Sequence, residues 1–227
     1  MKTDRRKQAG AFTLVEIMVA LTIFGLVLAA IYSSWTAILR ASKVGLDAAA
    51  RVQRERIAVH TLEDALSSAI SFAGDVEHYG FVTENGNQAS LSFVASLPES
   101  FPRGGKFGKF NVRRVTFSVE SGPNYARQLV LRQNLILMDM DIDEQQHPLV
   151  LARNVQEFSL GFWDLKQNDW VDEWPQTNQL PKWVKFTLRL GFPNQQNSYA
   201  QTQEAVTRVV SLPAISVPAR WQGRPGG

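Results

Sequence analysis

The feature that most constrains this chain is an apolar segment at residues 12–39, in which Glu16 is the one charged residue. A helix needs about 20 apolar residues to cross a hydrocarbon core about 30 Å thick, so this segment is long enough to span a membrane. No proline occurs before Pro98, so nothing in the sequence interrupts a helix that begins near residue 13. The sequence therefore predicts a transmembrane helix over residues 12–39.

The net charge of the chain resides in the short segment ahead of the apolar run. The chain has 24 Lys and Arg against 21 Asp and Glu, a formal net charge of +3 and a pI near 9.3. Four basic residues and Asp4 lie within residues 1–11, and four minus one accounts for the whole excess. By the positive-inside rule this segment lies in the cytoplasm, and the residues after the helix lie outside it. The rest of the chain carries equal numbers of basic and acidic side chains. Its net charge therefore gives no reason to expect nucleic-acid binding.

A secretory signal peptide and a plain membrane anchor are simpler explanations of this N-terminus. A signal peptide has an apolar core of about 7–15 residues and then a small-x-small cleavage site, which residues 27–29 match poorly. The apolar run is longer, and it keeps Glu16, whose carboxylate costs about 2.5–3.5 kcal/mol at the centre of a membrane helix. A membrane-anchored periplasmic binding module would keep its N-terminus uncut, so the mass of the N-terminal peptide distinguishes these readings.

Beyond the membrane segment the helical pattern continues and becomes amphipathic. Apolar residues recur at steps of mostly three and four, at positions 59, 62, 66, 69, 70 and 73. We expect one helix from residue 13 to about residue 72, whose part at residues 40–73 packs on a folded domain. Gly45 is the expected flexible joint, because glycine weakens a helix by about 1 kcal/mol relative to alanine. His60 on this helix is expected to be solvated.

Residues 74–227 show the period-two alternation and the Gly, Pro and Asn punctuation of strands joined by turns. Strands are predicted near residues 90–95, 115–119, 128–137, 149–151, 155–163, 183–190 and 205–212. Residues 98–108 are predicted to form an exposed loop. The large aromatic residues of this region are expected in hairpins and in the core, namely Trp163, Trp170, Trp174 and Trp183. One long helix followed by many strands predicts an α+β fold, with the helix packed on one antiparallel sheet or two.

An acidic run has the spacing of the first three oxygen ligands of a calcium loop, at Asp139, Asp141 and Asp143. Glu144 and Val150 stand where an EF-hand loop needs Gly and Glu, so we favour an acidic strand over a calcium site. The apolar residues between the acids would then face inward, namely Met138, Met140 and Ile142.

Residues 104–109 resemble a phosphate-binding loop only faintly. A Walker A motif that ended at Lys109 would need Gly and Ser or Thr at positions where this chain has Arg103 and Phe110. The absence of Cys excludes disulfides, zinc ribbons, Cys-ligated iron–sulfur clusters and cysteine nucleophiles. The three histidines are scattered over segments of different type, at positions 60, 78 and 147. We therefore expect no enzymatic activity, no cofactor and no metal site.

The start of the apolar segment matches a known pattern. The sequence Gly-Ala-Phe-Thr-Leu-Val-Glu that ends at Glu16 resembles the class III leader of type IV pilins and type II secretion pseudopilins. The resemblance implies that a prepilin peptidase removes residues 1–11, cutting before Phe12, and methylates the new N-terminus of Phe12. The family usually has Gly before the Phe, where this chain has Ala11. A cut after Gly10 would place Glu16 at the sixth mature position instead of the fifth.

The resemblance also implies an assembly role for Glu16. Its carboxylate would pair with the free N-terminal amine of a neighbouring subunit, so that the two charges compensate each other in the membrane and direct fibre assembly. Small side chains would let neighbouring helices approach closely, namely Ala20, Gly25, Ala29, Ala30 and Ser33.

The second half of the chain narrows the resemblance. Strands, a Trp pair and a Leu-Pro step at residues 149–163, 170–174 and 180–188 resemble the J-class minor pseudopilins of type II secretion, as does the acid pair within residues 62–66. This implies a single-pass protein of the bacterial inner membrane with a periplasmic domain at residues 74–227, and a role in starting the pseudopilus tip. The implied partners are the I-class and K-class minor pseudopilins, the major pseudopilin, the prepilin peptidase and exported proteins. The alternative is a minor pilin of a type IV pilus or DNA-uptake system, which shares the leader and the long helix.

Overall fold

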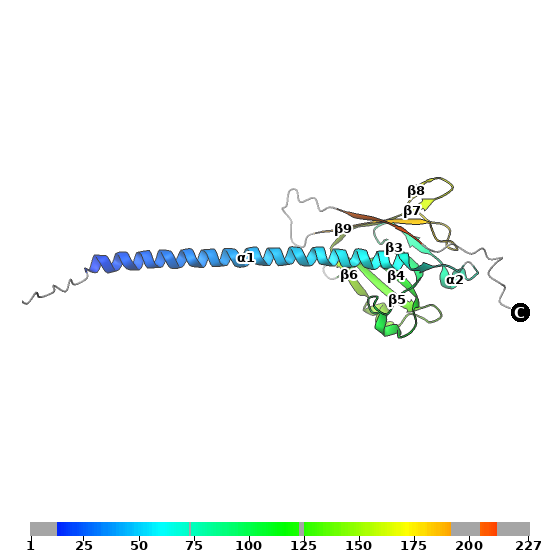
Figure 1. Cartoon of the computed structure of the whole chain (residues 1–227), viewed down its shortest axis with the longest axis horizontal. Coiled ribbons are helices and arrows are strands. Elements are labelled where there is room, and N and C mark those ends of the chain that lie inside the picture. The colour runs from blue at the N-terminus through cyan, green and yellow to red at the C-terminus, as the bar shows by residue number, and fades with distance from the viewer. Residues whose placement is uncertain (1–12, 73, 123–124, 192–204, 213–227) are drawn as a thin grey trace, which may run out of the picture. The chain divides into compact units, whose positions relative to one another are not determined.

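The computed structural model describes residues 13–72, 74–122, 125–191 and 205–212 (Figure 1). Contacts between residues divide the chain into two compact units, Met1–Val52 and Gln53–Gly227. The helix α1 (Leu14–Ser67) begins in the first unit and ends in the second, and it continues through Gly45 without a break. The flexible joint at Gly45 stays a prediction.

Helix α1 ends at Ser67, short of the end near residue 72 that the sequence predicted, so that prediction is wrong by about one turn. The hydroxyl of Ser68 donates to the carbonyl oxygen of Asp64 at 2.8 Å, and the backbone nitrogen of Ser96 donates to the carbonyl oxygen of Ser68 at 2.9 Å. The chain then leaves the helix for a sheet. Apolar spacing does not reveal this exit, because residues of either structure can face the core.

The first sheet of the Gln53–Gly227 unit is antiparallel, and in the described residues it has the order β1-β3-β4-β5-β6, with β2 also paired to β3. Its strands are β1 (Ala69–Ile70), β2 (Val82–Glu84), β3 (Ser90–Ser96), β4 (Val112–Ser121), β5 (Arg127–Leu135) and β6 (Leu149–Arg153). Short helices lie in its connections, namely α2 (Val76–Tyr79), the 3-10 helix η1 (Gly104–Phe107) and α3 (Ile142–Gln146).

The second sheet is also antiparallel, with the order β10-β9-β7-β8 in the described residues. Its strands are β7 (Val155–Asp164), β8 (Asp169–Val171), β9 (Trp183–Leu190) and β10 (Val206–Ser211). Strand β9 alternates between a buried face, which includes Val184 and Phe186, and an outer face, which includes Lys185 and Thr187. This alternation follows from the opposite directions of successive side chains in a strand.

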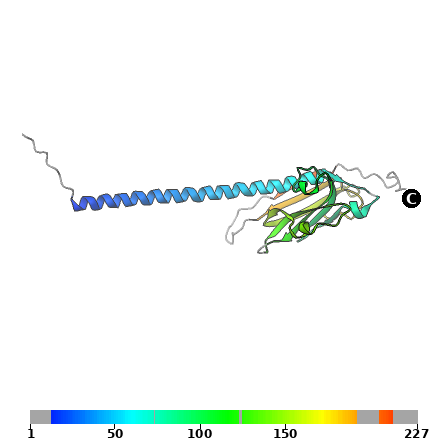
Figure 2. The same cartoon turned by 90° about the horizontal axis from the view of Figure 1, so that it is seen from below.

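One hydrophobic core joins the end of α1 to the inner faces of both sheets. Figure 1 and Figure 2 show the last turns of α1 beside the two sheets. The helix contributes fully or almost fully buried side chains, namely Ala58, Val59, Leu62, Ala65 and Leu66. The ring of Phe81 connects the sheets, because its centroid lies 5.8 Å from that of Phe93 in β3 and 6.1 Å from that of Phe162 in β7.

The predicted α+β fold is confirmed, and two antiparallel sheets are present. Each strand expected from the alternation occurs, with ends displaced by a few residues. The short strands β1, β2 and β8 were not expected, because two or three residues give too little periodicity to recognise. Residues 98–108 are not simply an exposed loop, since Phe101 is 5% exposed and packs in the core and Gly104 is also buried.

Candidate functional site

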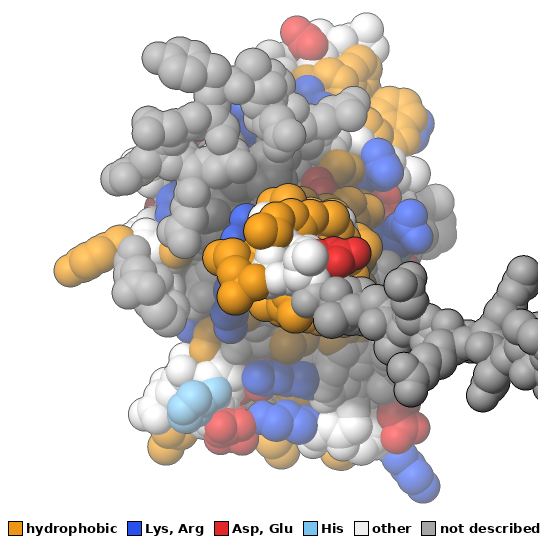
Figure 3. Space-filling view, turned by 90° about the vertical axis from the view of Figure 1, so that its left-hand side faces the viewer, with side chains coloured by type: hydrophobic (Ala, Val, Ile, Leu, Met, Phe, Trp, Pro, Cys, Tyr) orange, Lys and Arg blue, Asp and Glu red, His pale blue; other side chains and the backbone are white. Residues whose placement is uncertain are grey.

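The first candidate site is the apolar part of α1 in the Met1–Val52 unit. Every large apolar side chain within residues 14–39 is exposed, and Figure 3 shows hydrophobic side chains around much of the helix seen from its N-terminal end. By length and composition alone this helix could cross a membrane. An apolar surface of this extent needs lipid or other protein chains around it.

Glu16 lies in the first turn of this helix. The backbone nitrogen of Glu16 donates to Oγ1 of Thr13 at 3.3 Å and to the carbonyl oxygen of Thr13 at 3.1 Å. The Thr-x-x-Glu spacing is that of a capping box, and it places the carboxylate at the positive end of the helix dipole. In the described part of the chain no side chain pairs with the Glu16 carboxylate, and its assembly role stays a prediction.

The small residues of the apolar helix lie on more than one face. At 3.6 residues per turn, Gly25 and Ala29 share a face, whereas Glu16 and Ala20 share a face about 140–180° away. Ala30 lies about 100° from Ala29 around the helix. A Cβ atom at Gly25 would meet nothing within 4 Å. Two separate faces are thus suited to close helix contacts, and the roles of these residues stay predictions.

The residues of the expected leader cleavage and N-methylation, Gly10, Ala11 and Phe12, lie outside the described residues. Cleavage between Ala11 and Phe12 therefore stays a prediction from the sequence.

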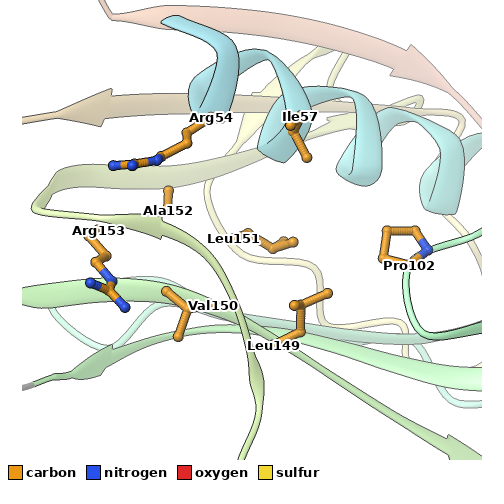
Figure 4. A pocket seen from close by; sticks show the side chains of 8 residues that line it. All are labelled: Arg54, Ile57, Pro102, Leu149, Val150, Leu151, Ala152 and Arg153. Atoms are coloured by element: carbon orange, nitrogen blue, oxygen red, sulfur yellow. The ribbon is translucent and has the colours of Figure 1, made fainter. Parts of the chain in front are cut away.

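A groove of about 510 Å³ lies in the Gln53–Gly227 unit between α1 and strand β6 (Figure 4). Ile57 from the helix, Leu151 from the strand and Pro102 give it apolar walls. Arg54 and Arg153 lie together at one end of the view, and neither has an ion pair within the described residues. Strand β6 is the last of its sheet, so its outer edge has no strand partner among the described residues.

The acidic run forms a capped helix and ion pairs. Oδ1 of Asp141 accepts a hydrogen bond from the backbone nitrogen of Asp143 at 3.1 Å and caps α3. The ammonium of Lys106 donates to Asp143 and thereby lowers the pKa of that carboxyl. Buried Glu144 lies 3.0 Å from the guanidinium of Arg103. Met138 and Ile142 were expected to face inward from a strand, but both side chains are exposed. The prediction of an acidic strand is therefore wrong.

These acids do not assemble into a cation site. Among the described residues, no group of three or more His, Asp or Glu is arranged to hold a metal ion. The carboxylates of Asp143 and Glu144 instead face cationic side chains, which tie α3 to the segment around η1.

The glycine–lysine segment at residues 104–109 has a packing explanation. A Cβ atom at Gly104 would lie 2.2 Å from the carbonyl oxygen of Glu99, so only glycine fits there. Phe107 covers the buried Arg113, whose guanidinium carbon lies 4.8 Å from the ring centroid. No cradle of backbone nitrogens is needed to account for these residues.

The three histidines do not share a site. His60 is exposed on α1, as expected, and lies 3.2 Å from Glu63. His78 lies on α2 beside the carboxylate of Asp75. His147 lies at the end of α3 beside the carboxylate of Asp143.

Three of the four tryptophans occupy the hairpin or core positions expected of them. Trp174 packs against the core, and Trp163 and Trp170 pair across the β7–β8 hairpin. Trp183 joins these two rings in a cluster on the outer face of the second sheet, which sequence reasoning missed. The alternation of β9 indicates this position, because Trp183 directly precedes the buried Val184 and so points to the opposite face of the sheet.

Two family models match the chain. The model described as "Type II secretion system (T2SS), protein J" matches residues 34–197, which is more than half of the chain. The model described as "Prokaryotic N-terminal methylation motif" matches residues 6–32. A comparison with curated proteins found no match.

Two solved structures are similar to this chain at low sequence identity. One is a chain in the crystal structure of the GspK–GspI–GspJ complex from the enterotoxigenic Escherichia coli type 2 secretion system, with 13% identity and a TM-score of 0.46 over 73% of this chain and 99% of that chain. The other is a type IV-like pilin from Thermus thermophilus, with 11% identity and a TM-score of 0.42 over 71% of this chain and 96% of that chain.

Proposed function

This chain belongs to the protein J family of the type II secretion system, the J-class minor pseudopilins, and we propose that it forms part of the pseudopilus tip and helps to initiate fibre assembly. The observation that carries the proposal is the family match over residues 34–197, together with the methylation motif at residues 6–32. Both matches favour a structural subunit of a secretion fibre over an enzyme.

The apolar helix is the proposed assembly element. Its exposed apolar side chains would lie in the inner membrane before assembly and against other helices in the fibre. Its two faces of small residues, one with Gly25 and Ala29 and one with Ala20, would let two neighbouring helices approach closely. The proposed neighbours are the I-class and K-class minor pseudopilins and, further along the fibre, the major pseudopilin.

Glu16 is the residue proposed to align neighbouring subunits in the fibre. A carboxylate in the apolar part of a membrane helix is costly, and a helix-terminus interaction returns only about 0.3–1 kcal/mol at exposed sites. The free amine of Phe12 on a neighbouring subunit would compensate the remainder. This pairing requires removal of residues 1–11 by the prepilin peptidase, since the amine of Phe12 does not exist before cleavage.

The proposed location follows from the same segment. The basic residues within residues 1–11 would hold the N-terminus in the cytoplasm, and the Gln53–Gly227 unit would then lie in the periplasm. There it would be placed to meet exported proteins.

Co-purification tests this proposal. The full chain, expressed with its I-class and K-class partners, is extracted in mild detergent and captured by a tag on the K-class partner. Glu16→Gln removes the charge at nearly constant shape, and Asp47→Asn is the matched control, because Asp47 is an exposed acid on α1 beyond the apolar run. Wild type and Asp47→Asn should be recovered equally, and Glu16→Gln should be largely lost.

Two outcomes would contradict the proposal at different points. Equal recovery of Glu16→Gln would refute the role of Glu16, and failure of the wild type to co-purify would refute membership of the tip complex. Mass spectrometry of the N-terminal peptide should find N-methylated Phe12 in all three proteins, and an intact residue 1 would refute processing.

A further inference from the structure

The outer face of the second sheet carries a cluster of three indole rings. Trp163 in β7 pairs across the ladder with Trp170 in β8, with ring centroids 5.4 Å apart and planes at 74°. The ring of Trp183 in β9 lies 5.7 Å from that of Trp163 at 64°. All three side chains are partly exposed, and they lie on the face opposite the buried Phe162 and Val184.

Two lysines lie across these rings. Nζ of Lys182 is 4.6 Å from the ring centroid of Trp183, and Nζ of Lys185 is 4.7 Å from that of Trp170. Lys185 in β9 pairs with Gly161 in β7, and a Cβ atom at Gly161 would lie 3.0 Å from Cε of Lys185. The missing side chain of Gly161 therefore gives Lys185 room to cross β7 and reach a ring on the next strand.

The charges of these lysines are not neutralised by the described part of the chain. Neither Lys182 nor Lys185 has a carboxylate within ion-pair distance there, whereas Arg189 on the same face of β9 pairs with Glu157 at 3.1 Å. Contact with an aromatic ring positions an ammonium group but leaves its net charge in place. The cluster thus combines large, ordered aromatic surface with two uncompensated positive charges.

We propose that this Trp–Lys surface, formed by Trp163, Trp170, Trp183, Lys182 and Lys185, is a docking site for an acidic segment of a partner protein. Tryptophan is enriched among the residues that dominate binding energy at protein interfaces, because a large, rigid ring loses little entropy on contact. Carboxylates of the partner would complement the two ammonium groups and raise the association rate.

The C-terminal segment of this chain is a poor occupant by charge. Residues 213–227 follow β10, whose Ser211 pairs with Trp183, but they contain Arg220 and Arg224 and no acidic residue.

This inference goes beyond the proposed role in fibre initiation and does not depend on it. Helix assembly would involve the apolar segment, whereas docking would involve the outer face of the second sheet. Loss of one function therefore need not alter the other.

Peptide binding to the full chain in nonionic detergent tests the proposal. Three fluorescein-labelled 12-residue peptides share the same two Phe residues and carry Glu, Gln or Lys at the other positions. Fluorescence anisotropy should show binding of the Glu peptide alone, weakened by raising the salt from 50 to 500 mM. The double variant Lys182→Gln/Lys185→Gln should bind the Glu peptide about tenfold more weakly.

The control double variant is Lys43→Gln/Lys109→Gln, which loses the same charge at exposed positions on α1 and after η1. It should bind like the wild type, and both variants should keep the near-UV circular dichroism of the wild type. Trp170→Ala, a change at the sheet edge, should weaken binding independently of charge.

Several results would overturn the proposal. These are equal binding of the three peptides, equal weakening by the two double variants, or no effect of Lys182→Gln/Lys185→Gln. Binding of the Glu peptide only after deletion of residues 213–227 would show that the C-terminal segment occupies the surface. Binding of phosphatidylglycerol vesicles through Lys182 and Lys185 in place of the Glu peptide would identify a lipid surface instead.

Discussion

Asn85 joins the two sheets through its side-chain amide. Nδ2 of Asn85 donates to the carbonyl oxygen of Leu160 at 2.9 Å, and the backbone nitrogen of Leu160 donates to Oδ1 of Asn85 at 3.0 Å. Nδ2 also donates to the carbonyl oxygen of Asp172. Asn85 follows β2 of the first sheet, whereas Leu160 lies on the stretch of β7 that β8 does not cover. One amide thus takes the place of a strand neighbour and ties the sheets together.

Replacement of Asn85 by Ala should be strongly destabilising. It leaves the backbone N–H and C=O of Leu160 without these partners, and the Leu160 residue is 2% exposed. A buried polar group left unpaired costs about 1–3 kcal/mol, so two such groups predict a loss of about 2–6 kcal/mol in the free energy of unfolding. Asn85→Asp should cost at least as much, because its carboxylate would face the carbonyl oxygens of Leu160 and Asp172.

Urea unfolding of the full chain in detergent, followed by tryptophan fluorescence, measures this loss. The matched control is Asn87→Ala, since Asn87 is exposed and accepts a hydrogen bond from Arg127 through its backbone carbonyl. The control should change the free energy of unfolding by less than about 0.5 kcal/mol. A loss below about 0.5 kcal/mol for Asn85→Ala would refute the view that this amide secures the edge of β7.

Three further changes test the core, a close backbone approach and an ion pair. Leu62→Ala, at a side chain that is 0% exposed in the core, should lower the free energy of unfolding by about 2–5 kcal/mol in the same urea assay, and a loss below 1 kcal/mol would contradict the packing. Gly104→Ala would place a Cβ 2.2 Å from a backbone carbonyl oxygen and should cost about 1–3 kcal/mol, whereas Gly105→Ala, with nothing within 4 Å, should be nearly neutral by thermal melting. The guanidinium of Arg132 holds the pKa of Glu120 below its ordinary value of 4.5, so their pair stabilises the fold above that pH and is lost as the pH falls through the lowered pKa. Glu120→Gln should therefore make the decline in melting temperature between pH 6 and pH 3 shallower, and an unchanged decline would contradict this assignment.

Local patterns predicted most of the elements of this fold. The apolar run and the absence of proline predicted the long helix, and the period-two alternation predicted the long strands, because each pattern reflects one buried face of one element. The end of α1 was mispredicted, since the exit at Ser68 depends on a backbone hydrogen bond from Ser96. The acidic run was mispredicted as a strand, because its carboxylates pair with Arg103 and Lys106, which lie far away in the sequence.

The sequence by itself determined that this protein has a membrane-length apolar helix with a carboxylate near its start and a β-rich remainder. These properties are local, since length, charge and periodicity are read from neighbouring residues. Only the tertiary structure decided that Asn85 secures the edge of β7 and that Gly161 lets Lys185 reach Trp170. Both arrangements join residues from separate parts of the chain, and strand order is set by the packing of a whole core, which no single segment encodes.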